Sequence, residues 1–271
     1  MLSGLRIVNL AVNLPGPAAA QRLQALGATV VKVEPPAGDP MEFYSQSWYR
    51  DMAAGQQVVR LDLKDAQGKE SLFSLLQNAD ALIAATRPAA LKRLGLDFDS
   101  LHPLFPNLCM VTITGYPPPD DNEAGHDLTY QAKMGLLDPP HMPRSLISDL
   151  AGAEQTVSAV LALLIQRERT GLAGQIVVPL SDAAARFAEP LRYGSTVSGA
   201  ILGGGLSEYN IYQARDGWVA VAALEPHFKA RLEQLLDIRS REEYQAAFAD
   251  QTTAYWKLWA QQHDLPMEIV R

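Results

Sequence analysis

The 271-residue chain is long enough for one large α/β domain with a smaller companion domain. Its formal net charge is −7, and no Lys- or Arg-rich run offsets it, which argues against a general nucleic-acid binder. Hydrophobic residues make up 48% of the sequence and charged residues 20%, the mixture of a globular protein, so we expect no long disordered stretch.

The single cysteine, Cys109, excludes an intrachain disulfide and a cysteine-based metal cluster. It lies in the apolar run 108–111, where we expect a buried, inert thiol. The N-terminal residues lack the apolar stretch and cleavage site of a signal peptide, and no window has the uninterrupted apolar length of a membrane helix. These features predict a cytoplasmic protein with no membrane segment.

The first two thirds of the chain alternate strand and helix patterns. We expect strands over residues 6–11, 29–34, 58–63, 81–84, 107–114 and 175–180, with helices over 18–26, 65–77, 150–169 and from 182 onward. Strands separated by helical crossovers predict a parallel, Rossmann-like sheet with helices on its faces.

The pattern changes after the glycine run 203–205. Two short strands, 209–213 and 218–222, flank an Asp216-Gly217 turn and predict a hairpin, whereas residues 226–262 are mostly helical in pattern. We therefore expect a large Rossmann-like α/β domain over residues 1–202 and a small α+β domain over residues 203–271.

The first strand–turn–helix unit carries Leu14-Pro15-Gly16-Pro17 rather than a G-x-G-x-x-G fingerprint. Without the second and third glycines a pyrophosphate cannot approach the backbone in the usual way, which argues against an NAD-dependent enzyme.

Four residues further along the chain have the chemistry of acids and bases. His126 and Asp127 open a short amphipathic segment; the histidine is either a surface residue at a helix start or a proton-transfer group. Asp149 lies between apolar residues at a helix start, where it is either an N-cap or a carboxyl group with a raised pKa. Glu225 follows a strand and precedes a helix, a position that the helix dipole favours for an acid.

Together, several segments resemble the class III CoA-transferase family (CaiB/BaiF type), which includes α-methylacyl-CoA racemases, formyl-CoA transferases and carnitine-CoA transferases. The resemblance runs from the first residues to about Phe228. It is carried by residues 3–11 with the following P-G-P, and by 27–36, 61–69, 87–96, 125–130, 148–149, 167–175 and 216–228.

The G-H-D and E-P patterns look like the racemase branch of that family. By resemblance, His126 and Asp149 are opposing proton-transfer residues, and Asp127 and Glu225 orient and tune the imidazole. The transferase branch uses the aspartate at the position of Asp149 as a nucleophile and usually lacks a histidine at position 126. We expect the N–H of Leu150 to stabilise the enolate oxygen of the substrate.

The resemblance also implies how CoA is held. Arg87 matches a family position near the nucleotide phosphates, and we group Tyr130 with it as a CoA-binding residue. Lys92 and Arg93 either add charge there or are solvated helix charges. We expect no metal and no tightly bound cofactor, since CoA enters as part of an acyl-CoA thioester substrate. The family further implies an interlocked homodimer in which Glu225 of the partner subunit faces His126.

The leading hypothesis is therefore α-epimerisation of a 2-methylacyl-CoA, a reaction of fatty acid metabolism. A first alternative is CoA transfer between carboxylic acids through Asp149. A second is a non-catalytic acyl-CoA-binding paralogue. Two departures from the family favour the second alternative: residues 53–57 lack a cation, and the chain ends at Arg271, so the small domain is expected to be incomplete. A third departure, the short loop 138–147, bears on the shape of the acyl pocket.

Overall fold

The computed structural model describes every residue from 1 to 271 and divides into two compact units, Met1–Ala188 and Glu189–Arg271. Each unit has hydrophobic clusters of its own. The boundary predicted near Gly203 falls inside the second unit, and the assignment of domains to those limits stays a prediction.

The first unit is built on a six-stranded sheet in the order β3-β2-β1-β4-β5-β6. All five strand pairings are parallel, which confirms the predicted α/β class. The strands are β1 (Arg6–Asn9), β2 (Thr29–Glu34), β3 (Gln57–Arg60), β4 (Ala81–Ala84), β5 (Cys109–Thr114) and β6 (Gln175–Pro179). Their ranges overlap all six predicted strands.

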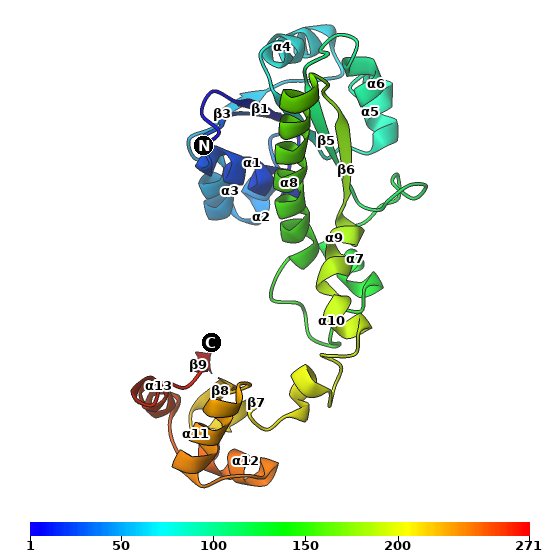
Figure 1. Cartoon of the computed structure of the whole chain (residues 1–271). Coiled ribbons are helices and arrows are strands. Elements are labelled where there is room, and N and C mark those ends of the chain that lie inside the picture. The colour runs from blue at the N-terminus through cyan, green and yellow to red at the C-terminus, as the bar shows by residue number, and fades with distance from the viewer. The chain divides into compact units, whose positions relative to one another are not determined.

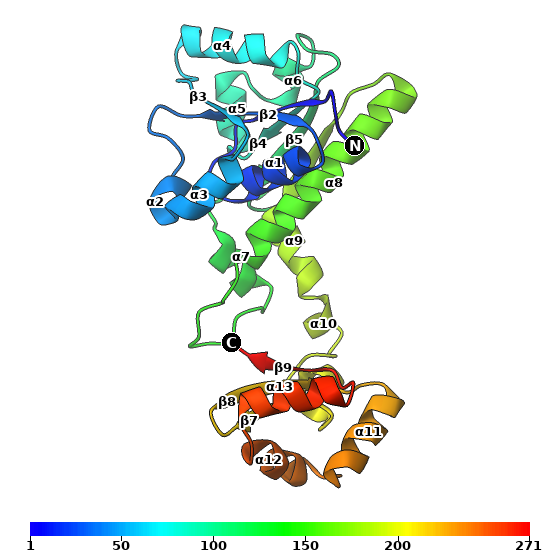
Figure 2. The same cartoon turned by 90° about the vertical axis from the view of Figure 1, so that its left-hand side faces the viewer.

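Helices cover both faces of this sheet (Figures 1 and 2). One face packs in a single cluster with α1 (Pro15–Ala25), α3 (Gln46–Ala53) and α8 (Ile147–Thr170). The other face packs with α4 (Ala66–Leu76), α5 (Pro88–Leu94) and α6 (Phe98–Leu101). Because both faces are covered, every residue of the central strands β4 and β5 is buried, Cys109 included. Burial raises the pKa of the Cys109 thiol.

Three short helices lie beyond the carboxyl ends of the strands: α2 (Met41–Tyr44), α7 (Asp127–Lys133) and α9 (Leu180–Phe187). The long helix α8 begins three residues before the predicted start. By length and composition alone it could cross a membrane, a feature that the sequence analysis overlooked, and 56% of its apolar window is buried within the fold. The core helix of a soluble protein has these properties too.

The second unit holds an antiparallel three-stranded sheet in the order β7-β8-β9. The predicted hairpin corresponds to β7 (Tyr209–Ala214) and β8 (Gly217–Ala222), whereas β9 (Met267–Val270) was not predicted. The remaining elements are α10 (Glu189–Arg192), the π-helical turn η1 (Ile201–Gly205), α11 (Pro226–Leu236), α12 (Arg241–Ala249) and α13 (Thr253–Gln262). Tyr212, Tyr244, Phe248 and Trp256 form the aromatic centre of this unit's core.

Candidate active site

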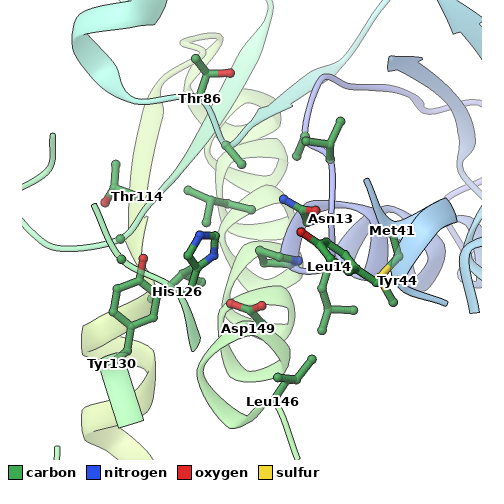
Figure 3. A pocket seen from close by; sticks show the side chains of 18 of the residues that line it. Asn13, Leu14, Met41, Tyr44, Thr86, Thr114, His126, Tyr130, Leu146 and Asp149 are labelled. Carbon is green, nitrogen blue, oxygen red and sulfur yellow. The ribbon is translucent and has the colours of Figure 1, made fainter. Parts of the chain in front are cut away.

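A cavity of about 640 Å³ opens at the carboxyl ends of β1, β4 and β5 (Figure 3). The segments 10–15, 85–87 and 113–115, which end or follow these strands, form three of its walls. The chain leaves β1 towards β2 on one side of the sheet and leaves β4 towards β5 on the other, so the strand order reverses between β1 and β4. Such a switch point is where open α/β sheets bind ligands.

His126, the residue that precedes α7, lines this cavity. Its backbone is extended, and its N–H donates a hydrogen bond of 3.0 Å to Thr129 Oγ1 in the first turn of the helix. This bond fixes the point at which the helix begins, while the imidazole stays exposed on the cavity wall.

Asp149 lines the same cavity from the first turn of α8. Figure 3 shows its carboxyl group and the His126 ring on neighbouring parts of the wall. Burial, followed by repulsion from the nearby Asp127 carboxylate, raises the pKa of Asp149 to about 7. No protein hydrogen bond to the carboxylate opposes this shift. Asp149 is therefore able to take up or release a proton near neutral pH.

Asp127 is only 4% exposed and points its carboxyl group at the start of α8. One oxygen, Oδ1, accepts the backbone N–H groups of Ser148 at 2.8 Å and of Asp149 at 3.1 Å. The other, Oδ2, accepts the side-chain amide of Gln131 at 2.5 Å. Asp127 thus caps α8 from another helix and fixes the backbone that carries Asp149. No hydrogen bond joins Asp127 to His126, and the predicted role in orienting the imidazole stays a prediction.

Tyr130 adds a phenol to the cavity. A Cβ on Gly115 would lie 2.5 Å from the Tyr130 hydroxyl oxygen, and one on Gly125 would lie 2.4 Å from the ring, so a side chain at either position would displace the phenol. Burial, with the nearby Asp149 carboxyl as a further cause, raises the pKa of Tyr130 to about 12. The hydroxyl therefore keeps its proton at neutral pH and can donate a hydrogen bond to a ligand.

Of the three predicted CoA-binding cations, only Arg87 lines the cavity. Arg87, the N-cap residue of α5, is exposed and lines the cavity. Lys92 and Arg93 lie in the last turn of α5, exposed and outside the cavity lining. Their position matches the solvated helix charges of the sequence analysis.

Glu225 belongs to the second unit, where it is the exposed N-cap residue of α11. It does not line the cavity of the first unit. Its predicted position opposite His126 in a dimer stays a prediction.

The early start of α8 corrects two expectations. The N-cap of this helix is Leu146, so Asp149 is inside the first turn and is not an N-cap. The N–H of Leu150 donates a hydrogen bond of 3.0 Å to the carbonyl oxygen of Leu146, so it is occupied within the helix and is not a free donor for an enolate oxygen.

Sequence analysis missed a further part of the cavity wall. It consists of Asn13, which has a left-handed backbone with φ 66°, and of side chains from α2 and α3, among them Met41, Tyr44 and Trp48. The rule that ligands bind at the carboxyl ends of strands could have indicated Asn13, which follows β1, but no motif marks the aromatic residues. No group of three or more His, Cys, Asp and Glu side chains is arranged to hold a metal ion.

Comparison with protein families gives a match over nearly the whole chain: the model of CoA-transferase family III matches residues 2–271. A curated relative, the probable fatty acyl-CoA transferase Rv3272 of Mycobacterium tuberculosis, is 31% identical over 202 residues, 68% of this chain and 51% of the relative. The alpha-methylacyl-CoA racemase of Mus musculus is 30% identical over 261 residues, 89% of this chain and 66% of the racemase.

The fold, too, is similar to that of Rv3272. A crystal structure of Rv3272 superposes with a TM-score of 0.84 and 27% sequence identity, covering 100% of this chain and 85% of that one. The chain spans between about half and two thirds of the length of the two curated relatives.

Proposed function

The chain belongs to CoA-transferase family III, and from that membership we propose that it acts on acyl-CoA thioesters, removing and returning the proton on the carbon next to the thioester carbonyl. On a 2-methylacyl-CoA this reaction inverts the α-carbon, which makes the protein a racemase or epimerase of branched acyl-CoAs.

One observation carries the proposal: His126 and Asp149 line one cavity from different elements, and the pKa of Asp149 is raised to about 7. A two-base epimerisation needs two acid/base side chains, and an imidazole together with a carboxyl group of raised pKa supplies them. A carboxyl group with an ordinary pKa would be a weaker base and would rarely hold the proton that it has to return.

In the reaction, one of the two groups takes the α-proton, and the electron pair of the broken C–H bond moves onto the thioester carbonyl as an enolate. The other group gives its proton to the opposite face of the α-carbon, so proton and charge balance. After one turnover the two groups have exchanged protonation states, and the reverse reaction restores them. Tyr130 donates a hydrogen bond to the ligand within the cavity, and Arg87 binds a CoA phosphate at its rim.

A second candidate is CoA transfer through Asp149. The curated relatives include several whose names are CoA-transferases, such as the succinyl-CoA:glutarate CoA-transferase of Homo sapiens. Here the Asp149 carboxylate attacks the thioester carbonyl, a C–O bond forms, and the CoA thiolate leaves. The absence of protein donors on the Asp149 carboxyl favours a free nucleophile and supports this candidate.

Trapping the reaction on Asp149 separates the two. The chain is incubated with 2-methylbutanoyl-CoA and a carboxylic acid acceptor, treated with hydroxylamine, and digested. The peptide that holds residues 148–150 is then analysed by mass spectrometry. We expect no hydroxamate on Asp149 while α-proton exchange proceeds, and no exchange in Asp149→Asn. A hydroxamate that forms at the turnover rate would establish the transferase, whereas binding with neither reaction would leave the non-catalytic acyl-CoA-binding alternative.

The assembly and location are parts of the same proposal. We expect the interlocked homodimer that the sequence predicts, in the cytoplasm, with no membrane or nucleic-acid partner. Light scattering of the purified chain, which gives the mass in solution, tests the dimer directly.

A further inference from the structure

A charged cluster is buried beneath the cavity wall at the end of β2. Lys32 is 1% exposed, Glu34 0% and Asp39 3%. Charged side chains are almost never buried this fully unless they are paired, because each loses its hydration. No proton-transfer step of the proposed reaction uses these two acids and one base, so their burial needs another explanation.

The Lys32 ammonium is the centre of the cluster. Its Nζ lies 2.7 Å from Glu34 Oε1 and 2.6 Å from Asp39 Oδ2, and 4.5 Å from the centre of the Tyr49 ring. The Tyr49 hydroxyl donates a hydrogen bond of 2.8 Å to Glu34 Oε1. Burial alone raises the pKa of Glu34, but the hydrogen bonds from Lys32 and Tyr49, together with the charges of Lys32 and Arg60, hold that pKa below its usual value. Glu34 is therefore an ionised carboxylate, paired with Lys32 inside the cluster and with Arg60 Nε at 3.6 Å from outside it.

Asp39 connects this cluster to the cavity. Its second oxygen, Oδ1, accepts the backbone N–H of Asn13 at 2.8 Å and that of Met41 at 2.9 Å. Asn13 belongs to the turn after β1, and Met41 is the first residue of α2, and both line the cavity. A single carboxylate oxygen thus joins two wall segments that are 28 residues apart in the chain.

The Asn13 turn needs such a support. Its φ of 66° lies in the left-handed region, which costs free energy for a residue other than glycine, although asparagine tolerates it best. The hydrogen bond from the Asn13 N–H to the Asp39 carboxylate supports this conformation, because a hydrogen bond to a carboxylate is stronger than one to a neutral acceptor. Asn13 Oδ1 is itself buried without a hydrogen-bond partner, so a shift of the turn would displace a polar atom of the cavity wall.

We propose that Asp39 is a positioning residue of the cavity: it fixes the Asn13 turn and the start of α2 as adjoining walls, and Lys32, 2.6 Å from its other oxygen, is its buried counter-charge. The ligand in question is the acyl-CoA thioester, so this part rests on the proposed function. Removal of the Asp39 carboxylate is expected to loosen both walls together and to weaken thioester binding, because small displacements of a supporting group carry over to the ligand.

Asp80 offers a matched control. Its carboxylate also accepts a backbone N–H, that of Arg6 at 2.8 Å, and pairs with a cation, Arg167, at 2.7 Å. It precedes β4 at the opposite, amino end of the strands and does not line the cavity. Loss of Asp80 therefore costs stability of a similar kind without touching the walls.

The experiment compares Asp39→Ala with Asp80→Ala in two measurements at a temperature where both are folded. The first is the Kd for isobutyryl-CoA, and the second is amide hydrogen exchange in peptides covering residues 10–15 and 40–45. We expect Asp39→Ala to raise the Kd roughly tenfold or more and to speed exchange in both peptides. We expect Asp80→Ala to leave the Kd and the exchange rates of both peptides unchanged. Equal Kd values for Asp39→Ala and the parent, or equal effects of the two variants, would overturn the proposal.

Asp39→Asn keeps the test decisive if Asp39→Ala does not fold. Its amide oxygen still accepts the two backbone N–H groups, but its NH2 group faces the Lys32 ammonium, so we expect an intermediate rise in Kd of roughly threefold. A Kd equal to that of the parent chain would contradict the role of the Lys32 charge. If the parent chain binds no acyl-CoA, the proposed function fails, and the exchange of the two peptides alone decides whether Asp39 positions the walls.

Discussion

At the scale of single residues, the Asp149 carboxyl links stability to pH. Its pKa in the folded chain is about 7, against about 3.9 in an unfolded chain, so the folded state holds the proton more tightly. The stabilisation from this proton is complete below about pH 4 and is lost as the pH rises towards 7, a change of up to about 4 kcal/mol.

Asp149→Asn removes that dependence. We expect the free energy of unfolding of the variant, relative to the parent, to rise between about pH 4 and 7 and then to level off. Urea unfolding of variant and parent at a series of pH values measures this difference in free energy. The control is Asp138→Asn, which changes an exposed aspartate. A constant difference between variant and parent across this range would show that the Asp149 pKa is not raised.

Arg87 and Arg93 provide a paired test of CoA binding, since both belong to the same helical segment but only Arg87 lines the cavity. We expect Arg87→Ala to weaken CoA binding by about 1.5–3 kcal/mol, the size of a hydrogen bond to a charged group. Arg93→Ala is expected to bind CoA as the parent does. Titration calorimetry with CoA decides, and equal losses in the two variants would mean that neither arginine has a specific place in the site.

The residues that could be predicted from sequence are those inside short motifs. His126, Tyr130 and Asp149 line one cavity although they are separated along the chain, and Arg87 joins them. Asp127 could be picked out but not its contact with the start of α8, which depends on tertiary packing. Asp39 and Lys32 were not picked out, because a burial of 3% or 1% for a charged residue leaves no trace in composition or periodicity.

At the scale of elements, two glycines in helices show how closely the site is packed. A Cβ on Gly16 in α1 would lie 2.1 Å from the Ala11 Cβ, an atom that cannot move without the backbone. A Cβ on Gly152 in α8 would lie 2.2 Å from Leu180 Cδ2, the end of a side chain that can rotate.

Gly16→Ala and Gly152→Ala should therefore differ. We expect Gly16→Ala to lower the free energy of unfolding by about 1–3 kcal/mol, the cost of overpacking. For Gly152→Ala we expect a smaller change, because the helix propensity gained, about 1 kcal/mol, offsets the rotation of Leu180. Denaturant unfolding of the two variants measures both values. A larger loss in Gly152→Ala would contradict this account of the packing.

Among the elements, the parallel strands were the easiest to predict, since β4 and β5 are continuous apolar runs. The start of α8 was misplaced because Asp149 looks like an N-cap, while the actual capping acceptor is Asp127, 21 residues before Ser148 in the chain. Strand β9 was missed because a strand of four residues after a helix has too little pattern to show.

At the scale of the whole molecule, each unit carries its own core, so damage to one core should remain local. Phe248 is fully buried in the second unit and stacks on Tyr212, with the two ring centroids 4.9 Å apart. We expect Phe248→Ala to cost about 3–5 kcal/mol and to speed amide hydrogen exchange in residues 189–271. Exchange in the sheet of the first unit should stay as in the parent. Equal acceleration in both units would show that they unfold together.

Deuterium incorporation tests most directly whether the cavity of the first unit exchanges the α-proton of an acyl-CoA. One enantiomer of 2-methylbutanoyl-CoA is incubated with the chain in D2O, and the mass and the configuration at the α-carbon are followed. We predict that one deuterium enters as the configuration is lost, without any added acid. We also predict that His126→Ala slows both by about 10²-fold or more, while His141→Ala, an exposed histidine outside the cavity, does not. A thioester that keeps its α-proton and configuration, while its CoA moves to an added carboxylic acid, would contradict the account.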